Sequence, residues 1–93
     1  MSDVDETFFE RADEHIHLSN KQMSNVSIGK VSASMLYSVA RFNAWVSATG
    51  CDSADEMNKS KPEMIQYFVT EYEKMLIENL EDYIANFDKY MKQ

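Results

Sequence analysis

The sequence contains few of the residues that interrupt or cross-link a chain. It has two glycines, one proline and one cysteine among its 93 residues. Three long periodic segments result, with no strand-like alternation of useful length between them. The lone cysteine, Cys51, has no partner for an internal disulfide, so we expect a reducing compartment and a cytoplasmic protein.

Basic residues are also scarce. Nine lysines and arginines face sixteen acids, which gives a net charge of −7. This charge disfavours nucleic acids, which bind proteins through neutralised phosphates, and it disfavours anionic membrane surfaces. No apolar run approaches the roughly 18 residues of a membrane span, and the acidic N-terminus lacks the features of a secretory signal. We therefore expect no nucleic-acid or membrane partner.

Branched aliphatic and phenylalanine side chains are in short supply for a core. Leucine, isoleucine, valine and phenylalanine make up 20 of the 93 residues, and seven methionines and five tyrosines supplement them. Such adaptable and amphipathic side chains suit irregular or shared interfaces. A chain of this length forms one domain, residues 1–93, and is only marginally stable as a monomer.

The fold class that follows from the periodicity is all-α. We predict three main helices at about 4–24, 30–49 and 61–91, with a short helical turn at 53–59. Two capping boxes follow each other, Ser53-Ala-Asp-Glu56 and Ser60-Lys-Pro-Glu63. The second box has proline in the first turn, where its missing N–H costs nothing, so we place the start of the long C-terminal helix near Ser60.

The second predicted helix is apolar nearly all round. Val31, Met35 and Val39 lie on one face, and an alanine-rich face lies opposite. A helix of this kind is buried on several sides, and two other substantial helices can hardly surround it. This pattern is the first indication of a partner chain.

The last predicted helix carries a stripe that is too long for its own chain to cover. The stripe from Ile65 to Tyr90 measures about 38 Å, and each of the first two helices covers only about 30 Å. Either the helix breaks near Asn79 or Asn86, or another chain covers the distal end. Asn79 itself could fix the register of an interface, or simply interrupt the stripe. We expect a homodimer or a higher homo-oligomer.

Glu14 and His17 are the candidate metal ligands. Their Glu-x-x-His spacing is the one that carboxylate-bridged di-iron bundles use. His17 lies about 140° from the centre of the apolar face of its helix, however, so a solvated surface explains the motif more simply.

Arg41 is the candidate ligand-binding residue of the second helix, because a guanidinium can hold a carboxylate or phosphate with two hydrogen bonds. The structural alternative, which we favour, is a core or interface Arg41 paired with an acid of the fold. Asn43 is better explained by helix packing than by binding. The complete candidate set is Tyr37, Arg41, Asn43 and Trp45.

No catalytic signature accompanies these residues. Cys51 has no neighbouring base, and the acids of the last helix form a solvated face. Gly29 and Lys30 lack the remaining spacing of a phosphate-binding loop. We expect neither enzymatic activity nor a cofactor.

Four segments carry a family resemblance: Lys30–Trp45, Tyr67–Leu76, Glu78–Tyr83 and Asn86–Tyr90. They resemble a family of short bacterial proteins, domain-of-unknown-function family 3144, and the resemblance covers nearly the whole chain. It implies a helical fold and a bacterial source, and it implies no activity. Glu14 and His17 lie outside these segments.

The leading functional hypothesis is a non-enzymatic helical interaction or structural module that acts as a homo-oligomer. The alternative is a protein that binds a metal through Glu14 and His17, or a small ligand in a pocket around Tyr37 and Arg41. A third hypothesis, motivated by the net charge of −7, is an acidic partner for a basic protein.

Overall fold

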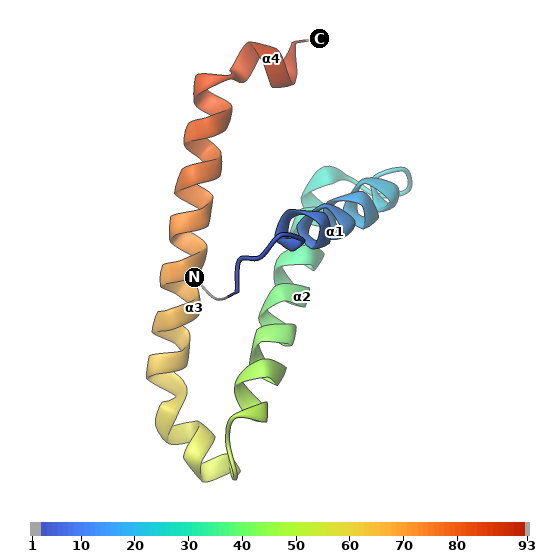
Figure 1. Ribbon diagram of the computed structural model, residues 1–93. Coiled ribbons are helices and arrows are strands. Elements are labelled where there is room, and N and C mark those ends of the chain that lie inside the picture. The colour runs from blue at the N-terminus through green and yellow to red at the C-terminus, as the bar shows by residue number, and fades with distance from the viewer. Residues whose placement is uncertain (1–2, 93) are drawn as a thin grey trace. The chain divides into compact units, whose positions relative to one another are not determined.

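The computed structural model describes residues 3–92, in which every regular element is an α-helix. The helices are α1 (Phe8–Gln22), α2 (Ile28–Thr49), α3 (Ala54–Ala85) and α4 (Phe87–Met91) (Figure 1). The predicted all-α class with three main helices is confirmed. The contacts group into two units whose boundary falls within α2, the first ending at Ala44 and the second beginning at Trp45. No helix of the described residues is both long enough and apolar enough to cross a membrane.

Asp5 fixes the start of α1. Its carboxylate accepts hydrogen bonds from the Thr7 backbone N–H and from Arg11 Nη2, both at 3.1 Å. Arg11 Nη1 also donates to Thr7 Oγ1 at 2.6 Å. The Arg11 guanidinium is the main cause that lowers the pKa of Asp5 below its ordinary value. A negative charge at a helix N-terminus complements the helix dipole, so Asp5 serves as the cap that the Thr7 side chain does not provide.

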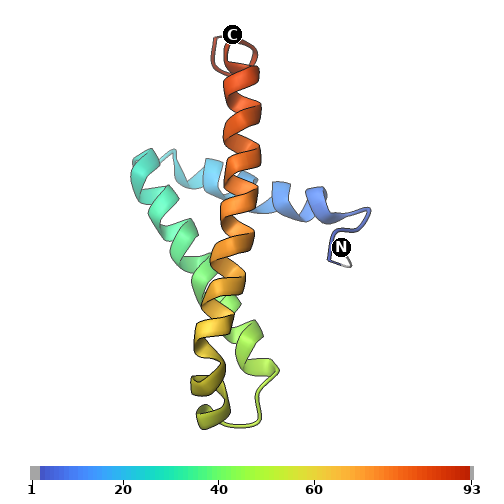
Figure 2. The same ribbon diagram turned by 90° about the vertical axis from the view of Figure 1, so that its left-hand side faces the viewer.

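The first unit is a helical hairpin. Figures 1 and 2 show α1 and the first turns of α2 diverging from the short turn that joins them. Val31 is the buried apolar residue of the described chain, at 4% exposure, and Met35 one turn later is half-buried. The Ser19 hydroxyl of α1 lies 3.4 Å from Met35 Sδ, which shows that α1 contacts this part of α2.

The turn between α1 and α2 needs no special glycine conformation. Gly29 lies inside α2, which begins at Ile28, and neither Gly29 nor Gly50 has a positive φ. Backbone N–H groups of Lys30 and Val31 donate to the Ser27 carbonyl, so the helical ladder is already established there.

The long helix α3 begins earlier than predicted, because the first of the two capping boxes forms the hydrogen bonds that cap the helix. Ser53 Oγ accepts from the Glu56 backbone N–H at 3.1 Å, and Glu56 Oε2 accepts from the Asp52 backbone N–H at 2.9 Å. The short turn expected at 53–59 is therefore the first part of α3. Pro62 lies inside the helix. A proline there leaves the carbonyl one turn earlier without its usual partner and bends a helix, and the first turns of α3 are visibly tilted (Figure 1).

The long helix ends at Ala85 with Asn86 as its C-cap, not at residue 91 as predicted; a break near Asn86 was one of the alternatives that the sequence left open. The backbone of Asn86 has φ −122° and ψ 30°, outside the helical region, and α4 begins at the next residue. Asn79, the other predicted break point, stays inside α3, and its side chain donates to the Met75 carbonyl at 2.8 Å.

The competing capping boxes give a test of the N-terminus of α3. We expect Ser53→Ala to lower the free energy of unfolding by about 1 kcal/mol, because it removes an N-cap hydrogen bond. Ser60→Ala is the matched control. It should leave stability unchanged or raise it by a few tenths of a kcal/mol, since Ser60 occupies a helix interior where alanine is preferred. Urea denaturation of the three proteins makes the comparison, and an equal effect of both substitutions would contradict the assignment.

Candidate functional site

The predicted metal ligands lie exposed on α1. Glu14 and His17 are both solvent-exposed and one turn apart. Among residues 3–92 no group of three or more histidine, cysteine, aspartate or glutamate side chains is placed to hold a metal ion. The structure brings no third ligand to this pair, and the metal site stays a prediction from spacing.

The predicted ligand-binding residues follow one another along α2. Tyr37 is 69% exposed and Trp45 is 62% exposed, and Arg41 lies between them at spacings of four residues. Asn43 is half-buried, as expected of a packing residue. These spacings put Tyr37, Arg41 and Trp45 on one side of a helix and Asn43 on another.

Arg41 differs from the structural interpretation that the sequence favoured. We expected a core or interface arginine held by an acid of the same chain. Arg41 is exposed, and the ion pairs formed among the described residues do not include it. A long flexible arginine on a solvated helix surface pays no burial cost, so the fold does not require a partner for it.

A long apolar surface lies on α3 and continues into α4. Six α3 side chains fall within a sector of about 80° at 100° per residue, and each is 42–59% exposed. Phe87, the first residue of α4, is 51% exposed. We call these seven residues the exposed stripe: Ile65, Val69, Tyr72, Leu76, Leu80, Tyr83 and Phe87.

A second face of α3 is distinct from this stripe. The half-buried residues of the first half of α3 include Met57, Met64 and Phe68. At 100° per residue this face lies roughly 100° around the helix from the exposed stripe. The helix therefore has two apolar faces, and the side chains of the stripe are the more exposed ones.

The corner between α3 and α4 is held by a small polar network around Asp82. Asn86 Nδ2 donates to the Asp82 carbonyl and to Asp82 Oδ1, both at 3.0 Å. The Tyr90 hydroxyl donates to Asp82 Oδ2 at 3.0 Å, and the ring of Tyr90 lies 4.6 Å from that of Tyr83. This hydrogen bond and the Asp82 charge raise the pKa of Tyr90 above its ordinary value. The short helix α4 is thus fixed over the Tyr83 end of the stripe.

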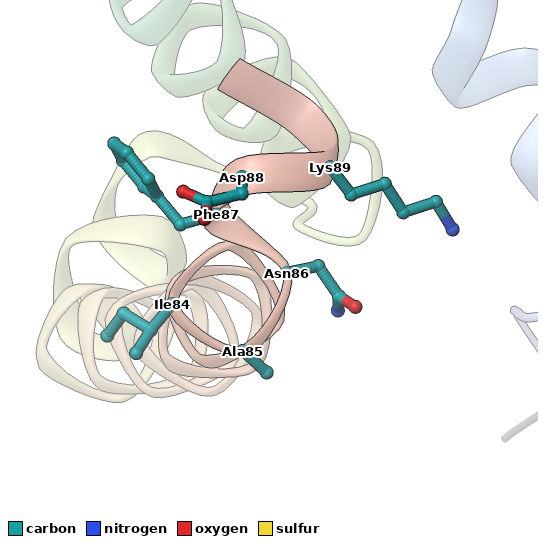
Figure 3. Close-up of a pocket in the computed structure, with 6 residues that line it drawn as sticks. All are labelled: Ile84, Ala85, Asn86, Phe87, Asp88 and Lys89. Carbon is teal, nitrogen blue, oxygen red and sulfur yellow. The ribbon is translucent and has the colours of Figure 1, made fainter. Parts of the chain in front are cut away.

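A shallow pocket of about 340 Å³ lies at the same corner. Ile84 and Phe87 point to one side of it, and Asn86 and Lys89 point away from them (Figure 3). Six consecutive residues of the corner line this pocket, and it gathers no set of groups suited to catalysis. Reasoning from sequence missed it. The residues involved do stand at helical spacing in the sequence, with Asp82 one turn before Asn86 and Tyr90 one turn after it. This spacing predicts a polar corner only once the helix is known to break at Asn86.

A family model described as "Protein of unknown function (DUF3144)" matches residues 8–84. The chain belongs to this family. The NMR structure of the protein NB7890A from Shewanella sp is similar to the chain, with 41% sequence identity and a TM-score of 0.78. The match covers 95% of this chain and 94% of that one. The search of curated proteins finds no match. The family resemblance predicted from the sequence is confirmed. Membership in this family indicates the fold and indicates no activity.

The Asp82 network gives this family member a pH-dependent corner. The neutral phenol is the form that donates to Asp82, so the contact stabilises the fold below pH 10 and is lost as pH rises through the raised pKa of Tyr90. We expect one of the five tyrosines to ionise later than the others in a phenolate absorbance titration. Asp82→Asn should remove this late component and Glu78→Gln, one turn earlier, should keep it. A late component that survives Asp82→Asn would contradict the assignment.

Arg41 gives a second test. We expect Arg41→Ala to change the free energy of unfolding by less than about 0.5 kcal/mol, because it removes an exposed side chain that forms no ion pair within the described chain. Val31→Ala is the contrast, and it should cost about 2 kcal/mol at a buried site. Thermal unfolding distinguishes them. A loss above 1 kcal/mol for Arg41→Ala would restore the paired interpretation.

Proposed function

We propose that this protein is a non-enzymatic helical interaction module that works as a homo-oligomer, in the simplest case a homodimer. The observation that carries the proposal is the exposed stripe of α3 and α4. Contiguous apolar surfaces of this kind on a small domain are typical of interaction sites. We propose the cytoplasm as its location, which suits the free thiol of Cys51.

The lengths of the helices support a partner. Helix α2 has 22 residues and spans about 33 Å, and α3 has 32 residues and spans about 48 Å. Residues 50–53 join the two helices, so their lengths allow α2 to cover α3 no farther than about Leu76, even if the two helices were fully antiparallel. Leu80, Tyr83 and Phe87 lie beyond that reach. Helix α1, with 15 residues, already uses the face that holds Ser19 against α2.

The area of the stripe is sufficient for a specific interface. Seven large side chains, each about half exposed, present roughly 700 Å² of surface per chain, compared with about 800 Å² per partner in interfaces of standard size. The net charge of −7 on each chain opposes association. Because salt screens such repulsion, the affinity should rise with ionic strength, whereas binding to a basic partner should fall.

Arg41 supports a second candidate function, the binding of a carboxylate or phosphate on α2. Its guanidinium is exposed between the aromatic residues Tyr37 and Trp45, and the described acids form no ion pair with it. An arginine in this setting can form a bidentate contact. Protection of the wild-type fold by phosphate or a dicarboxylate, lost in Arg41→Ala, would support this candidate.

The oligomeric state tests the main proposal. We expect light scattering at micromolar concentration to give a mass of at least twice the 10.8 kDa of the chain. Leu76→Asp should reduce the affinity by about a hundredfold or more, because a symmetric interface buries the new charge twice. The same side chain is 42% exposed in the chain, so the helical fold should persist by circular dichroism.

The matched control is Glu78→Gln, which lies two residues away on the opposite face of α3 and should leave the mass unchanged. A wild-type protein that is monomeric at these concentrations, at both low and high salt, would refute the proposal.

A further inference from the structure

The exposed stripe is symmetric about Leu76. Its residues follow one another at intervals of four, three, four, four, three and four positions. Read from either end, the order of intervals is the same. Val69 and Tyr83 are therefore equidistant from Leu76, as are Tyr72 and Leu80. Ile65 and Phe87 form the outermost pair in the sequence, but Phe87 lies beyond the break at Asn86, so the symmetry within α3 rests on the residues from Val69 to Tyr83. A helix with such a stripe presents the same apolar pattern in both directions.

We propose that the stripe is a self-docking surface, on which α3 of a second copy lies antiparallel across a two-fold axis at Leu76. This inference rests on the proposed homo-oligomer. A two-fold interface is self-complementary, so each residue faces the one equidistant from the axis on the other copy. Leu76 then meets Leu76 of the partner subunit, Val69 meets the partner's Tyr83, and Tyr72 meets the partner's Leu80.

The asparagines of α3 argue against the parallel alternative. A parallel coiled coil needs apolar residues at alternating intervals of three and four. Continuing the intervals from Val69, Tyr72 and Leu76 leads to Asn79 and then to Asn86 rather than to Leu80 and Phe87. The Asn79 amide donates to the Met75 carbonyl and the Asn86 amide to the Asp82 carbonyl, so both side chains are bound to their own helix. A helix crossing centred on Leu76 does not need these positions.

Helix α4 gives a second argument for the antiparallel arrangement. The contact between the rings of Tyr90 and Tyr83 places α4 on the side of α3 that bears the stripe. In a parallel pair, both copies of α4 would occupy the same end of the interface and compete for the same space. In the antiparallel pair, each α4 lies at an opposite end, beside the Ile65 end of the other copy.

The charged residues of α3 lie outside the exposed stripe. The stripe itself contains no charged residue, and Glu73 lies at its edge. At 100° per residue Glu71, Glu78 and Glu81 lie on the opposite half of the helix. A second copy of this chain can therefore dock without burying an acid, even though the chain is strongly acidic overall. A basic partner would find the acids on the other side of the helix.

Site-specific disulfide cross-linking of the full chain tests the arrangement. Each variant carries Cys51→Ser, so that the introduced cysteine is the only thiol. We expect Leu76→Cys to form a covalent dimer on mild oxidation. Val69→Cys alone and Tyr83→Cys alone should stay largely uncross-linked, and a mixture of the two should give the mixed dimer. Glu78→Cys, on the opposite face, is the control and should give no dimer above background.

The outcomes separate this inference from the proposed function. A covalent dimer of Leu76→Cys together with the mixed Val69–Tyr83 dimer supports the antiparallel docking. Self-cross-linking of Val69→Cys without the mixed product overturns it in favour of a parallel pair. A protein that is dimeric by light scattering but gives no Leu76→Cys product overturns the docking and leaves the oligomer intact. If the Cys51→Ser protein is monomeric, both the antiparallel docking and the proposed homo-oligomer are refuted.

Discussion

The rest of the structure depends on α3, a 32-residue helix that has two apolar faces. One face, with Met57, Met64 and Phe68, is half-buried within the chain. The other bears the exposed stripe. A short chain can order such a helix through a good N-cap and helical propensity, but it lacks the mass to cover both faces. Roughly 700 Å² of mostly apolar surface per chain stays in contact with water, which is unfavourable and which docking of a partner would relieve.

Much of the fold could be predicted from the sequence, because helix periodicity is a local property. The all-α class and the three main helices follow from the spacing of apolar residues. The sequence left open whether the last helix is continuous, with Asn79 and Asn86 as the two possible break points, and the structure shows the break at Asn86. The start of α3 was placed wrongly, because Ser53 and Ser60 both open a capping box. Only the structure shows that Glu56 completes the first box and that Pro62 is accommodated inside the helix.

The candidate sites were harder to predict, because they depend on what surrounds a helix. A sequence pattern indicates that α2 is apolar nearly all round, but it does not indicate which residues are covered. Arg41 was expected in the core or at an interface because its neighbours are apolar, yet it is exposed. The Asp82, Asn86 and Tyr90 network depends on the angle between α3 and α4, and no periodicity encodes that angle.

The acidity of the chain bears on how large an assembly can become. A stripe that is symmetric about one residue is fully used when a second copy docks on it, so the pair closes rather than growing into a fibre. The acids of α3 then remain on the outer surface of the pair, where the charge of each chain adds to that of the other. Repulsion between such surfaces opposes further association and keeps the pairs apart. In the proposed pair, the charge that weakens the contact would therefore also limit the assembly to two copies.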